Sequence, residues 1–544
     1  MPKNGATTYK GGFAMILTFL GGTHEVTGSM FYLEACGKHI LIDCGMEQGE
    51  DAFVNQELPI PAADVDSVLL THAHIDHSGR LPLLYKRGFR GDIHATGATS
   101  ELCDIMLRDS AHIQMSETEY RNRKARRSGD KLEEPIYDME DAINTIQKFV
   151  SHEYGERFEI YDGIEIRFTD VGHLLGSASI EVWVTEENVT KKLVFSGDIG
   201  NINQPLMRNP QYISEADYVI MESTYGDRDH GERPDYIGDL TEIIQDTFDR
   251  GGNLVIPSFA VGRTQMLLYY IRQIKEEERI KGHNNFKVFV DSPMAIEATK
   301  VYSDNLYGYF DKDTMALVSQ GINPIVFPGL ELSITADESK AINFDENPKI
   351  IISASGMCNA GRIRHHLKHN LWREESTVLF VGHQNPGTLG HIILNGAREV
   401  KLFGETISVD ARIHRMAGVS GHADKNGLVK WLASFDPKPK KVFVVHGDDE
   451  VCEGFKDYIN DELGYDAMAP YSGTVYDLRN NVVITEGERI PAVKASRKAD
   501  TVYQRLEQAG KRLMDVIKRN KGGANGDLRK FTNEINTLSN KWDR

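Results

Sequence analysis

The stretch THAHIDHSGRLPLL, Thr71 to Leu84, follows the apolar run VDSVLL and places four candidate metal ligands within six residues: His72, His74, Asp76 and His77. Imidazole and carboxylate groups are ligands that zinc and similar metals prefer, and ordinary surface composition would scatter them. On a loop between a strand and a helix, alternating residues can face opposite ways. His72 and His74 can then bind one metal, and Asp76 and His77 a second. The stretch therefore predicts a site for two metals.

Further candidate ligands stand directly after later predicted strands. His173 follows IEIRFTDV, Asp198 follows KLVF, and His446 follows KKVFVV. A single histidine or aspartate at a strand end is more often a capping or hydrogen-bonded residue. Because the same pattern of a strand followed by a metal-binding side chain recurs with the histidine-rich stretch, we interpret these residues as parts of one site.

The composition is that of a globular protein with room for two or more domains. The chain has 544 residues, of which 40% are hydrophobic and 26% charged. Apolar runs such as MILTFL are too short to cross a bilayer, and no signal-peptide pattern opens the chain. The five cysteines are widely spaced and include no C-x-x-C pair. We therefore expect a cytoplasmic protein without a membrane segment, with reduced and buried thiols.

The charge distribution divides the chain in two. A net charge of −18 argues against a protein that coats nucleic acid with a generally basic surface. From Lys494 to Arg544, however, 13 lysines and arginines stand against 6 acids. Residues 494–544 are therefore predicted to form a separate basic tail of two amphipathic helices joined by KGGANGD. Packing on the body or on a second subunit is the preferred role of this tail, with RNA binding as the alternative.

Alternating strand and helix patterns predict an α/β fold. Residues 1–13 form a polar leader, 14–226 the first part of a domain, 227–415 an inserted α/β unit with a parallel-sheet pattern, and 416–493 the return to the first domain. The charge-rich segment 117–156, with RNRKARR at 121–127, interrupts the pattern. We interpret it as a solvated insertion, with nucleic-acid contact as the alternative.

Six ordered motifs resemble those of a known family. HAHIDH, GHLLGSAS and SGD resemble motifs of the metallo-β-lactamase superfamily, and ESTYG, SGHAD and VVHGDDE those of its β-CASP branch of nucleases. Within this branch, the chain resembles the RNA-processing group, whose motifs are similar to PSFAVGRTQ, DSPMA and SASGM. This group includes the endonuclease subunit of the pre-mRNA 3′-end cleavage factor and its prokaryotic relatives. The resemblance covers about Ile16 to Val493 and implies a metallo-β-lactamase αββα sandwich with an inserted β-CASP α/β domain.

The resemblance also implies the arrangement of the metal ligands. It places the first metal between His72, His74 and His173, the second between Asp76, His77 and His446, with Asp198 as a bridge. Two zinc ions per chain are expected, with manganese as the alternative. Asp43 is expected to orient a ligand histidine. His446 favours RNA over DNA as the substrate, and His24, where relatives usually carry another residue, is expected to be a loop residue and not a ligand.

The implied activity is hydrolysis of single-stranded RNA by a two-metal mechanism with hydroxide attack, leaving a 3′-hydroxyl and a 5′-phosphate. Endonuclease cleavage is expected, with 5′→3′ exonuclease activity as an addition. The expected catalytic residues are Asp76, His422 as the general acid, and Glu222, which would orient His422. Backbone phosphates are expected to contact the following residues: Ser355, Gly356, Arg263, Thr388 and Gly390.

Two alternative functions remain open. The same metal site could serve a small thioester or lactone, or the chain could be a non-catalytic RNA-processing scaffold. A homodimer through the tail or the inserted domain is also expected.

In RIRHHLKH, His365 and His369 have the spacing of some helical zinc sites, but no H-E-x-x-H glutamate lies between them. We therefore expect a solvated or cleft-facing helix there.

Overall fold

The computed structural model describes residues 15–48, 53–129, 131–382, 384–416, 420–491 and 502–542. The predicted leader, 1–13, lies outside the described residues. The chain divides into two compact units, Met1–Ile490 and Pro491–Arg544. No helix in the described part of the chain has both the length and the apolar composition that a membrane span requires.

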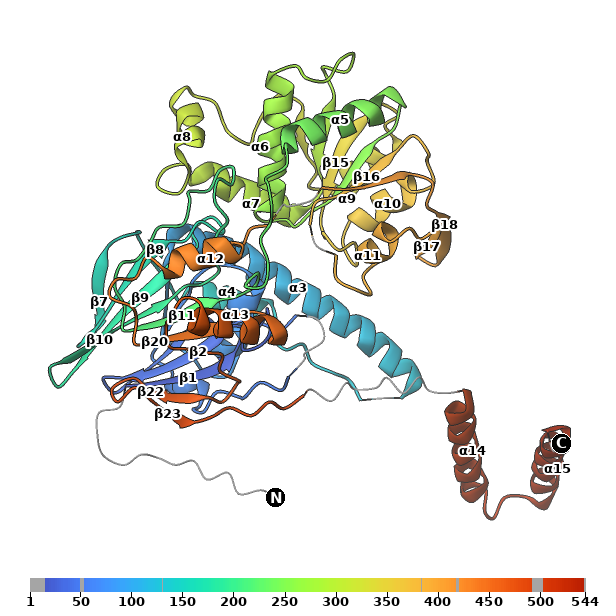
Figure 1. Ribbon diagram of the computed structural model, residues 1–544. Coiled ribbons are helices and arrows are strands. Elements are labelled where there is room, and N and C mark those ends of the chain that lie inside the picture. The colour runs from blue at the N-terminus through green and yellow to red at the C-terminus, as the bar shows by residue number, and fades with distance from the viewer. Residues whose placement is uncertain are drawn as a thin grey trace. The chain divides into compact units, whose positions relative to one another are not determined.

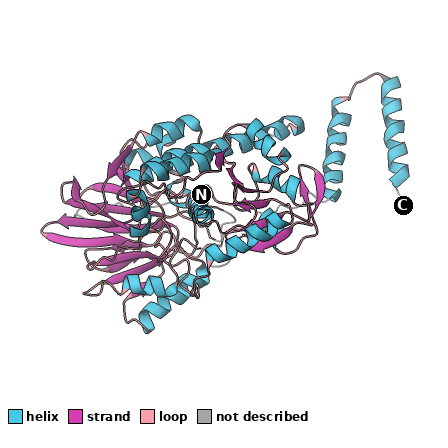
Figure 2. Ribbon diagram, turned by 90° about the horizontal axis from the view of Figure 1, so that it is seen from above, coloured by secondary structure: helices cyan, strands magenta, loops and turns pink. Residues whose placement is uncertain are grey.

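Two sheets form the centre of the first domain (Figures 1 and 2). The strands of the first sheet are β1 (Ile16–Gly21), β2 (Met30–Ala35), β3 (Lys38–Ile42), β4 (Ser67–Leu69), β5 (Asp92–Thr96), β6 (Phe149–His152), β22 (Val475–Asp477) and β23 (Val482–Thr485). Those of the second are β7 (Arg157–Tyr161), β8 (Ile164–Asp170), β9 (Ala178–Glu186), β10 (Val189–Phe195), β11 (Tyr218–Glu222), β20 (Lys441–Val445) and β21 (Ala467–Met468). Their orders are β23-β22-β1-β2-β3-β4-β5-β6 and β21-β20-β11-β10-β9-β8-β7.

The two sheets pack face to face because their strands alternate apolar side chains inward. In β8, Ile164, Ile166 and Phe168 are buried while the residues between them are half-exposed. Across the interface, the rings of Phe19 and Phe443 lie 4.9 Å apart. The space between the sheets is therefore a continuous apolar core.

Helices cover the outer face of each sheet, as Figure 2 shows. The helices of this domain are α1 (Ile75–Ser78), α2 (Leu81–Lys86), α3 (Gly97–Ser128), α4 (Met139–Ile146), α12 (Lys425–Leu432) and α13 (Asp449–Asp461), with a short 3-10 helix at Ala62–Asp64. Leu102 and Tyr137 pack on the first sheet, and Trp431 and Phe455 on the second. The predicted αββα sandwich is confirmed.

The inserted region has its own parallel sheet, of order β14-β13-β15-β12-β16-β19. Its strands are β12 (Leu254–Pro257), β13 (Lys287–Val290), β14 (Leu330–Leu332), β15 (Lys349–Ser353), β16 (Thr377–Phe380) and β19 (Arg412–Arg415), with a separate ribbon of β17 (Glu399–Leu402) and β18 (Glu405–Ser408). Its helices are α5 (Tyr236–Asp249), α6 (Arg263–Glu276), α7 (Pro293–Asp304), α8 (Lys312–Ser319), α9 (Ala336–Phe344), α10 (Ile363–Asn370) and α11 (Leu389–Leu394).

The insertion leaves and rejoins the second sheet between neighbouring strands. β11 ends at Glu222, β20 begins at Lys441, and the two strands pair in parallel. In Figure 1 the inserted sheet and its helices lie apart from the two-sheet core. An ion pair of 2.9 Å between Arg108 of α3 and Glu297 of α7 joins the two regions. The exact domain boundaries stay predictions.

The charge-rich segment 117–156 begins as a continuation of a helix, which the sequence pattern did not predict. α3 runs without a break through RNRKARR to Ser128 and ends at Gly129, whose φ of 79° suits glycine. Arg121 pairs with Glu133 at 2.8 Å, while Arg126 and Arg127 are exposed. Helical propensity and the Gly129 cap explain the length of α3. Contact of this helix end with nucleic acid stays a prediction.

A buried ion network supports the C-terminal edge of the inserted sheet. Asp291 follows β13 and is fully buried, and its carboxylate accepts hydrogen bonds from His366 at 2.6 Å and from Arg362 at 2.7 Å. His365 and His369, whose spacing resembles that of some helical zinc sites, are not among the buried residues of α10. The buried histidine is His366, which lies between them and faces the sheet.

We expect Asp291→Ala to destabilise the protein by about 3–5 kcal/mol, because it removes the carboxylate partner of fully buried His366 and of partly exposed Arg362. Burial disfavours the charged carboxylate, but the hydrogen bonds from His366, Ser339 and Arg362 lower the pKa of Asp291 to about 2. The contribution of Asp291 is therefore present above its unfolded-state pKa of about 3.9 and is lost as the pH falls towards 2. Urea unfolding at neutral pH and at pH 3 measures both effects. The exposed Asp337→Ala is the control, and equal stabilities of the two variants would contradict the prediction.

The second unit contains two helices, α14 (Val502–Arg519) and α15 (Asn525–Trp542), as the sequence predicted. Leu513, Val516, Phe531 and Ile535 are half-buried. Leu506, Met514, Leu538 and Trp542 are 54–68% exposed. Self-association or RNA binding through this unit stays a prediction.

The five cysteines are free thiols. Cys44, Cys103, Cys358 and Cys452 are buried, as expected, but Cys36 is only half-buried because it lies in the turn between β2 and β3.

Candidate metal centre

The candidate ligands meet because their strands end at the same edge of the two sheets. The THAHIDH stretch follows β4, His173 follows β8, Asp198 follows β10 and His446 follows β20. Asp76 and His77 lie in α1, which begins directly after His74. Short loops after buried strands hold these side chains in place.

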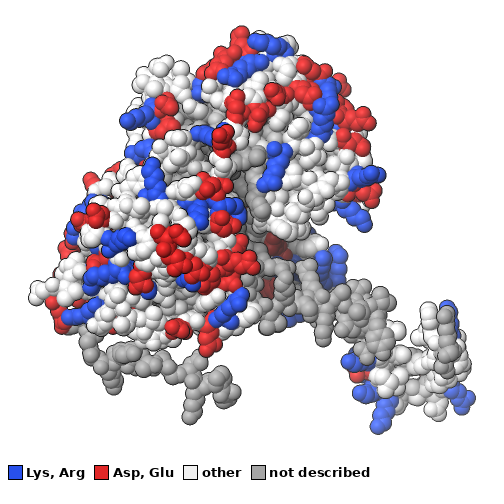
Figure 3. Space-filling model, viewed as in Figure 1, with Lys and Arg blue, Asp and Glu red and all other residues white. Residues whose placement is uncertain are grey.

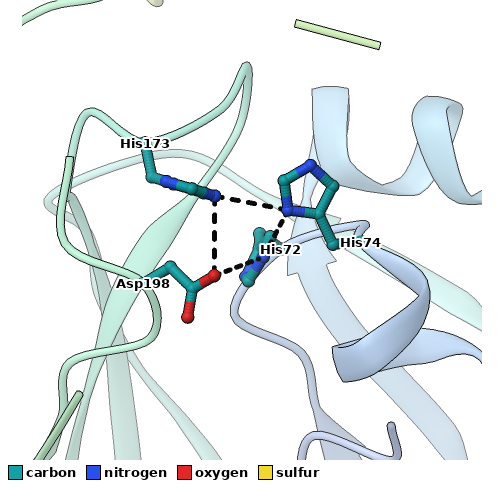
Figure 4. A group of neighbouring side chains, drawn as sticks. All are labelled: His72, His74, His173 and Asp198. Carbon is teal, nitrogen blue, oxygen red and sulfur yellow. Dashed lines mark hydrogen bonds and ion pairs between the residues drawn. The ribbon is translucent and has the colours of Figure 1, made fainter. Parts of the chain in front are cut away.

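The first group consists of His72, His74, His173 and Asp198 (Figure 4). Nδ1 of His74 lies 3.1 Å from Nε2 of His72 and 3.2 Å from Nε2 of His173. Oδ2 of Asp198 lies 3.4 Å and 3.5 Å from the same two Nε2 atoms. Three imidazole nitrogens and a carboxylate oxygen therefore converge on one point.

The second group consists of Asp76, His77 and His446. Nε2 of His446 lies 3.2 Å from Nε2 of His77 and 3.7 Å from Oδ2 of Asp76. Oδ1 of Asp198 lies 3.2 Å from His77 and 3.6 Å from His446. Asp198 therefore directs one carboxylate oxygen to each group.

The donor set fits zinc. Three imidazoles and a carboxylate are ligands of tetrahedral zinc sites. Oδ1 of Asp198 is buried and accepts no well-directed hydrogen bond from the described residues. A buried carboxylate oxygen without a donor is costly, and a cation between the two groups would satisfy it.

Most of these groups also favour the protonation states that bind metal. Burial and the nearby His72 lower the pKa of His74 to about 3. Burial also opposes the charged form of Asp198, but His446, His77 and His72 outweigh it and hold its pKa well below the usual range. His77 and His446 differ. Burial disfavours both cations, but Asp198 and Asp43 raise the pKa of His77 well above its usual value, and Asp198 and Asp76 raise that of His446, so a metal would compete with a proton at both residues.

Neighbouring residues orient the histidine rings. Asp43 accepts a hydrogen bond of 2.7 Å from Nδ1 of His77 and one of 2.8 Å from the Thr71 hydroxyl, which directs Nε2 of His77 towards Asp198. The Thr224 hydroxyl lies 3.1 Å from Nδ1 of His446. Asp43 was predicted in this role, whereas Thr71 and Thr224 were missed. Their positions, beside the first ligand and inside ESTYG, were the available signal.

His422 and Glu222 lie beside the metal groups. Nδ1 of His422 is 3.2 Å from Oε1 of Glu222, and Nε2 is 3.9 Å from Oδ2 of Asp198. Burial disfavours the imidazolium, but the carboxylates of Glu222 and Asp198 raise the pKa of His422 to about 9. Glu222 is fixed in turn, because Oε1 accepts the backbone N–H of Ile199 at 2.6 Å. The structure therefore places the His422 imidazole next to the candidate ligands, beside two carboxylates that favour its protonated form.

His24 lies in the loop after β1, as expected, and outside the metal-binding groups of the described residues. Its ring is buried, stacks on Tyr471 with centroids 3.7 Å apart, and lies 2.8 Å from a carboxylate oxygen of Asp449. These contacts are those of a packed, hydrogen-bonded side chain.

The predicted phosphate contacts follow the ends of three neighbouring parallel strands. Arg263 follows β12, Ser355 and Gly356 follow β15, and Thr388 and Gly390 follow β16. The N–H of Gly390 donates to the carbonyl of Met357, and the Thr388 hydroxyl to that of Asn385, so both are engaged within the loop.

Arg263 is the least satisfied of these groups. Its Nε atom is buried without a hydrogen-bond partner, and it forms no ion pair with any described residue. Burial lowers the pKa of its guanidinium to about 10, against the effect of the nearby hydroxyls of Tyr236, Tyr270 and Tyr225. An enclosed cation without an acid partner is a suitable site for an anion.

Comparison with known proteins agrees with this geometry. Residues 25–246 match the family profile described as metallo-beta-lactamase superfamily, 264–393 the Beta-Casp domain, and 406–470 the Zn-dependent metallo-hydrolase RNA specificity domain. Ribonuclease TTHA0252 of Thermus thermophilus is 36% identical over 433 residues, which cover 79% of this chain and 92% of that protein. The chain belongs to the β-CASP branch of the metallo-β-lactamase superfamily. The predicted resemblance is thereby confirmed.

Other proteins are also similar to the chain. The transcription termination factor FttA of Methanocaldococcus jannaschii is 30% identical over 463 residues, covering 83% of this chain and 69% of that protein. A crystal structure of a protein of unknown function from Enterococcus faecalis V583 covers 87% of this chain and all of that chain, with 13% identity and a TM-score of 0.48. Ribonuclease TTHA0252 and FttA together confirm that this chain lies in the RNA-processing nuclease group of the β-CASP branch.

Proposed function

We propose that the protein is a zinc-dependent ribonuclease that hydrolyses phosphodiester bonds in single-stranded RNA and leaves a 3′-hydroxyl and a 5′-phosphate. The observation that carries the proposal is the position of Asp198 between two groups of metal-binding side chains. The similarity to a named ribonuclease supports RNA as the substrate. Endonuclease cleavage is the proposed main activity, with 5′→3′ exonuclease activity as an addition.

The two groups would hold two metals. His72, His74 and His173 would bind the first, Asp76, His77 and His446 the second, and Asp198 both. Such a metal pair, when bound, supplies an activated water and stabilises charge on the attacking and leaving oxygens. Zinc is the proposed metal because imidazole dominates the donor set.

His422 would donate the proton that the leaving 3′ oxygen needs. Glu222 accepts a hydrogen bond from Nδ1 of His422, and its charge favours the imidazolium. The proton on Nε2 of His422 is then directed towards the candidate metal ligands. General acid catalysis of this kind contributes about 10²–10⁴-fold to the rate.

Local groups would bind the RNA backbone although the chain is acidic overall. Figure 3 shows acidic and basic side chains interspersed on the visible face rather than one large field of either sign. Arg263, Ser355 and Gly356 are the proposed phosphate contacts at the end of the inserted sheet. Such contacts position a strand without reading its sequence.

Product analysis tests the function. We would incubate 5′-labelled single-stranded RNA, and DNA of the same sequence, with zinc-loaded protein and map the ends of the products. Internal RNA cuts with 5′-phosphate ends are expected, with little cutting of DNA. Intact RNA combined with hydrolysis of a thioester or lactone would overturn the proposal, and so would 3′-phosphate ends.

We expect Asp43→Asn to weaken zinc binding about 10- to 100-fold, because the substitution removes the charge that orients His77. Zinc affinity can be measured by competition with a chromophoric chelator. Asp66→Asn is a matched control, because Asp66 also accepts hydrogen bonds from the first sheet but lies outside the metal groups. Unchanged affinity in Asp43→Asn would contradict the assigned role.

A further inference from the structure

A cavity of about 310 Å³ lies behind the loop that carries His422. Its walls include Ile199 and Gly200, which directly follow Asp198, and Ser420 and Ala423, which flank His422. The remaining walls come from the rest of the chain between β10 and β11, which includes Tyr212, from the chain leading into α5, from α6, and from α12, which includes Lys430. The cavity therefore shares two backbone segments with the candidate active site. Its volume is within the range of small-ligand sites.

The chemistry of the walls suits a nucleobase. Tyr236 and Tyr270 line the cavity with their rings 5.8 Å apart. Tyr212 also lines it and is 45% exposed, so its ring is accessible. Ile199 and Met266 add apolar surface. Bases of single-stranded RNA are commonly held by stacking on such aromatic side chains.

Two cations at the cavity lack acid partners. The ammonium of Lys430 lies 5.5 Å from the centre of the Tyr212 ring, and the guanidinium of Arg233 donates to the Tyr270 hydroxyl at 3.2 Å. Both side chains are exposed, and neither forms an ion pair with a described residue. Aromatic rings beside unpaired cations are the combination that binds bases together with their phosphates.

We propose that this cavity receives the base of the nucleotide on the 5′ side of the cut bond. This inference rests on the proposed ribonuclease activity and on His422 as the proton donor. The leaving 3′ oxygen belongs to the upstream nucleotide, so the upstream sugar lies next to His422. Nε2 of His230 lies 3.1 Å from the backbone carbonyl of His422, and His230 is also a wall of the cavity. The upstream base is therefore the one that reaches the cavity, and Tyr212 stacks on it.

The test combines protein variants with altered RNA. On an RNA with one mapped cut, Tyr212→Ala is expected to raise KM about tenfold with kcat nearly unchanged, and Tyr212→Trp to restore binding, because stacking tolerates any aromatic ring. Tyr307→Ala, which removes a 74% exposed tyrosine outside the cavity wall, is the matched control. Fluorescence anisotropy of the same RNA with a chelator present gives a binding readout that does not depend on cleavage.

The decisive comparison uses an abasic nucleotide on either side of the cut. An abasic nucleotide directly upstream of the cut should weaken RNA binding by the wild type about tenfold. It should not weaken RNA binding by Tyr212→Ala any further, because the stacking partner is already lost. An abasic nucleotide directly downstream should weaken RNA binding by both proteins equally. If RNA is cut but the upstream abasic site and Tyr212→Ala act additively, or Tyr212→Ala has no effect, the cavity assignment is wrong. If the wild type cuts no RNA, the proposed function itself fails.

Discussion

Asp198→Ala is expected to lower the rate of RNA cleavage by roughly three orders of magnitude or more, because Asp198 reaches both groups of candidate ligands. Stabilisation of charge by bound metals contributes several kcal/mol to such reactions, and about 1.4 kcal/mol corresponds to a factor of ten. The variant should also bind less metal. Metal content can be determined by mass spectrometry of the purified protein, beside single-turnover cleavage of labelled RNA.

The control for this substitution is Asp337→Ala, which removes an aspartate whose side chain is 93% exposed. It should retain both activity and metal. Because metals bound to the folded state stabilise it, the wild type should also unfold at a lower temperature after treatment with a chelator, whereas Asp198→Ala should respond less. If Asp198→Ala keeps its full metal content and rate, the shared site between the two groups is wrong.

The sequence could predict the two-sheet sandwich and the convergence of the ligands, because both depend on local patterns. Period-two alternation, as in Ile164, Ile166 and Phe168, marks a strand with one buried face. Each candidate ligand follows such a strand: the histidine-rich stretch, His173, Asp198 and His446. Because the ends of neighbouring strands share an edge of a sheet, these ligands were expected to lie close together. The resemblance of the six motifs to those of a known family then predicted how these strands are arranged in the fold.

Other features depend on contacts between distant segments and were not predictable in this way. His366 looks like its neighbours His365 and His369 in sequence, and only its position opposite Asp291 makes it the buried member. The hydrogen bonds of Thr71 and Thr224 depend likewise on ring orientation at the site. The cavity beside His422 is formed by four separate segments and has no motif of its own.

The second large effect is expected at His422. His422→Ala should slow RNA cleavage about 10²- to 10⁴-fold while leaving metal content and RNA binding nearly unchanged, because the imidazole acts on the leaving oxygen and is not a proposed ligand. The cleavage rate of Glu222→Gln should lie between those of the wild type and His422→Ala. The substitution keeps a hydrogen-bond acceptor for Nδ1 of His422 but removes the charge that favours the imidazolium. The exposed His414→Ala is the matched control.

A modified leaving group separates proton donation from a structural role of His422. In RNA whose scissile 3′ oxygen is replaced by sulfur, the leaving thiolate needs no proton, since its pKa is far below that of an alkoxide. The difference between the wild type and His422→Ala should then shrink to about tenfold or less, because the missing catalytic step is no longer required. If the variant remains as impaired with sulfur as with oxygen, His422 acts by shaping the site or holding the metals. The upstream position of the base in the neighbouring cavity, which depends on proton donation by His422, would then lose its support as well.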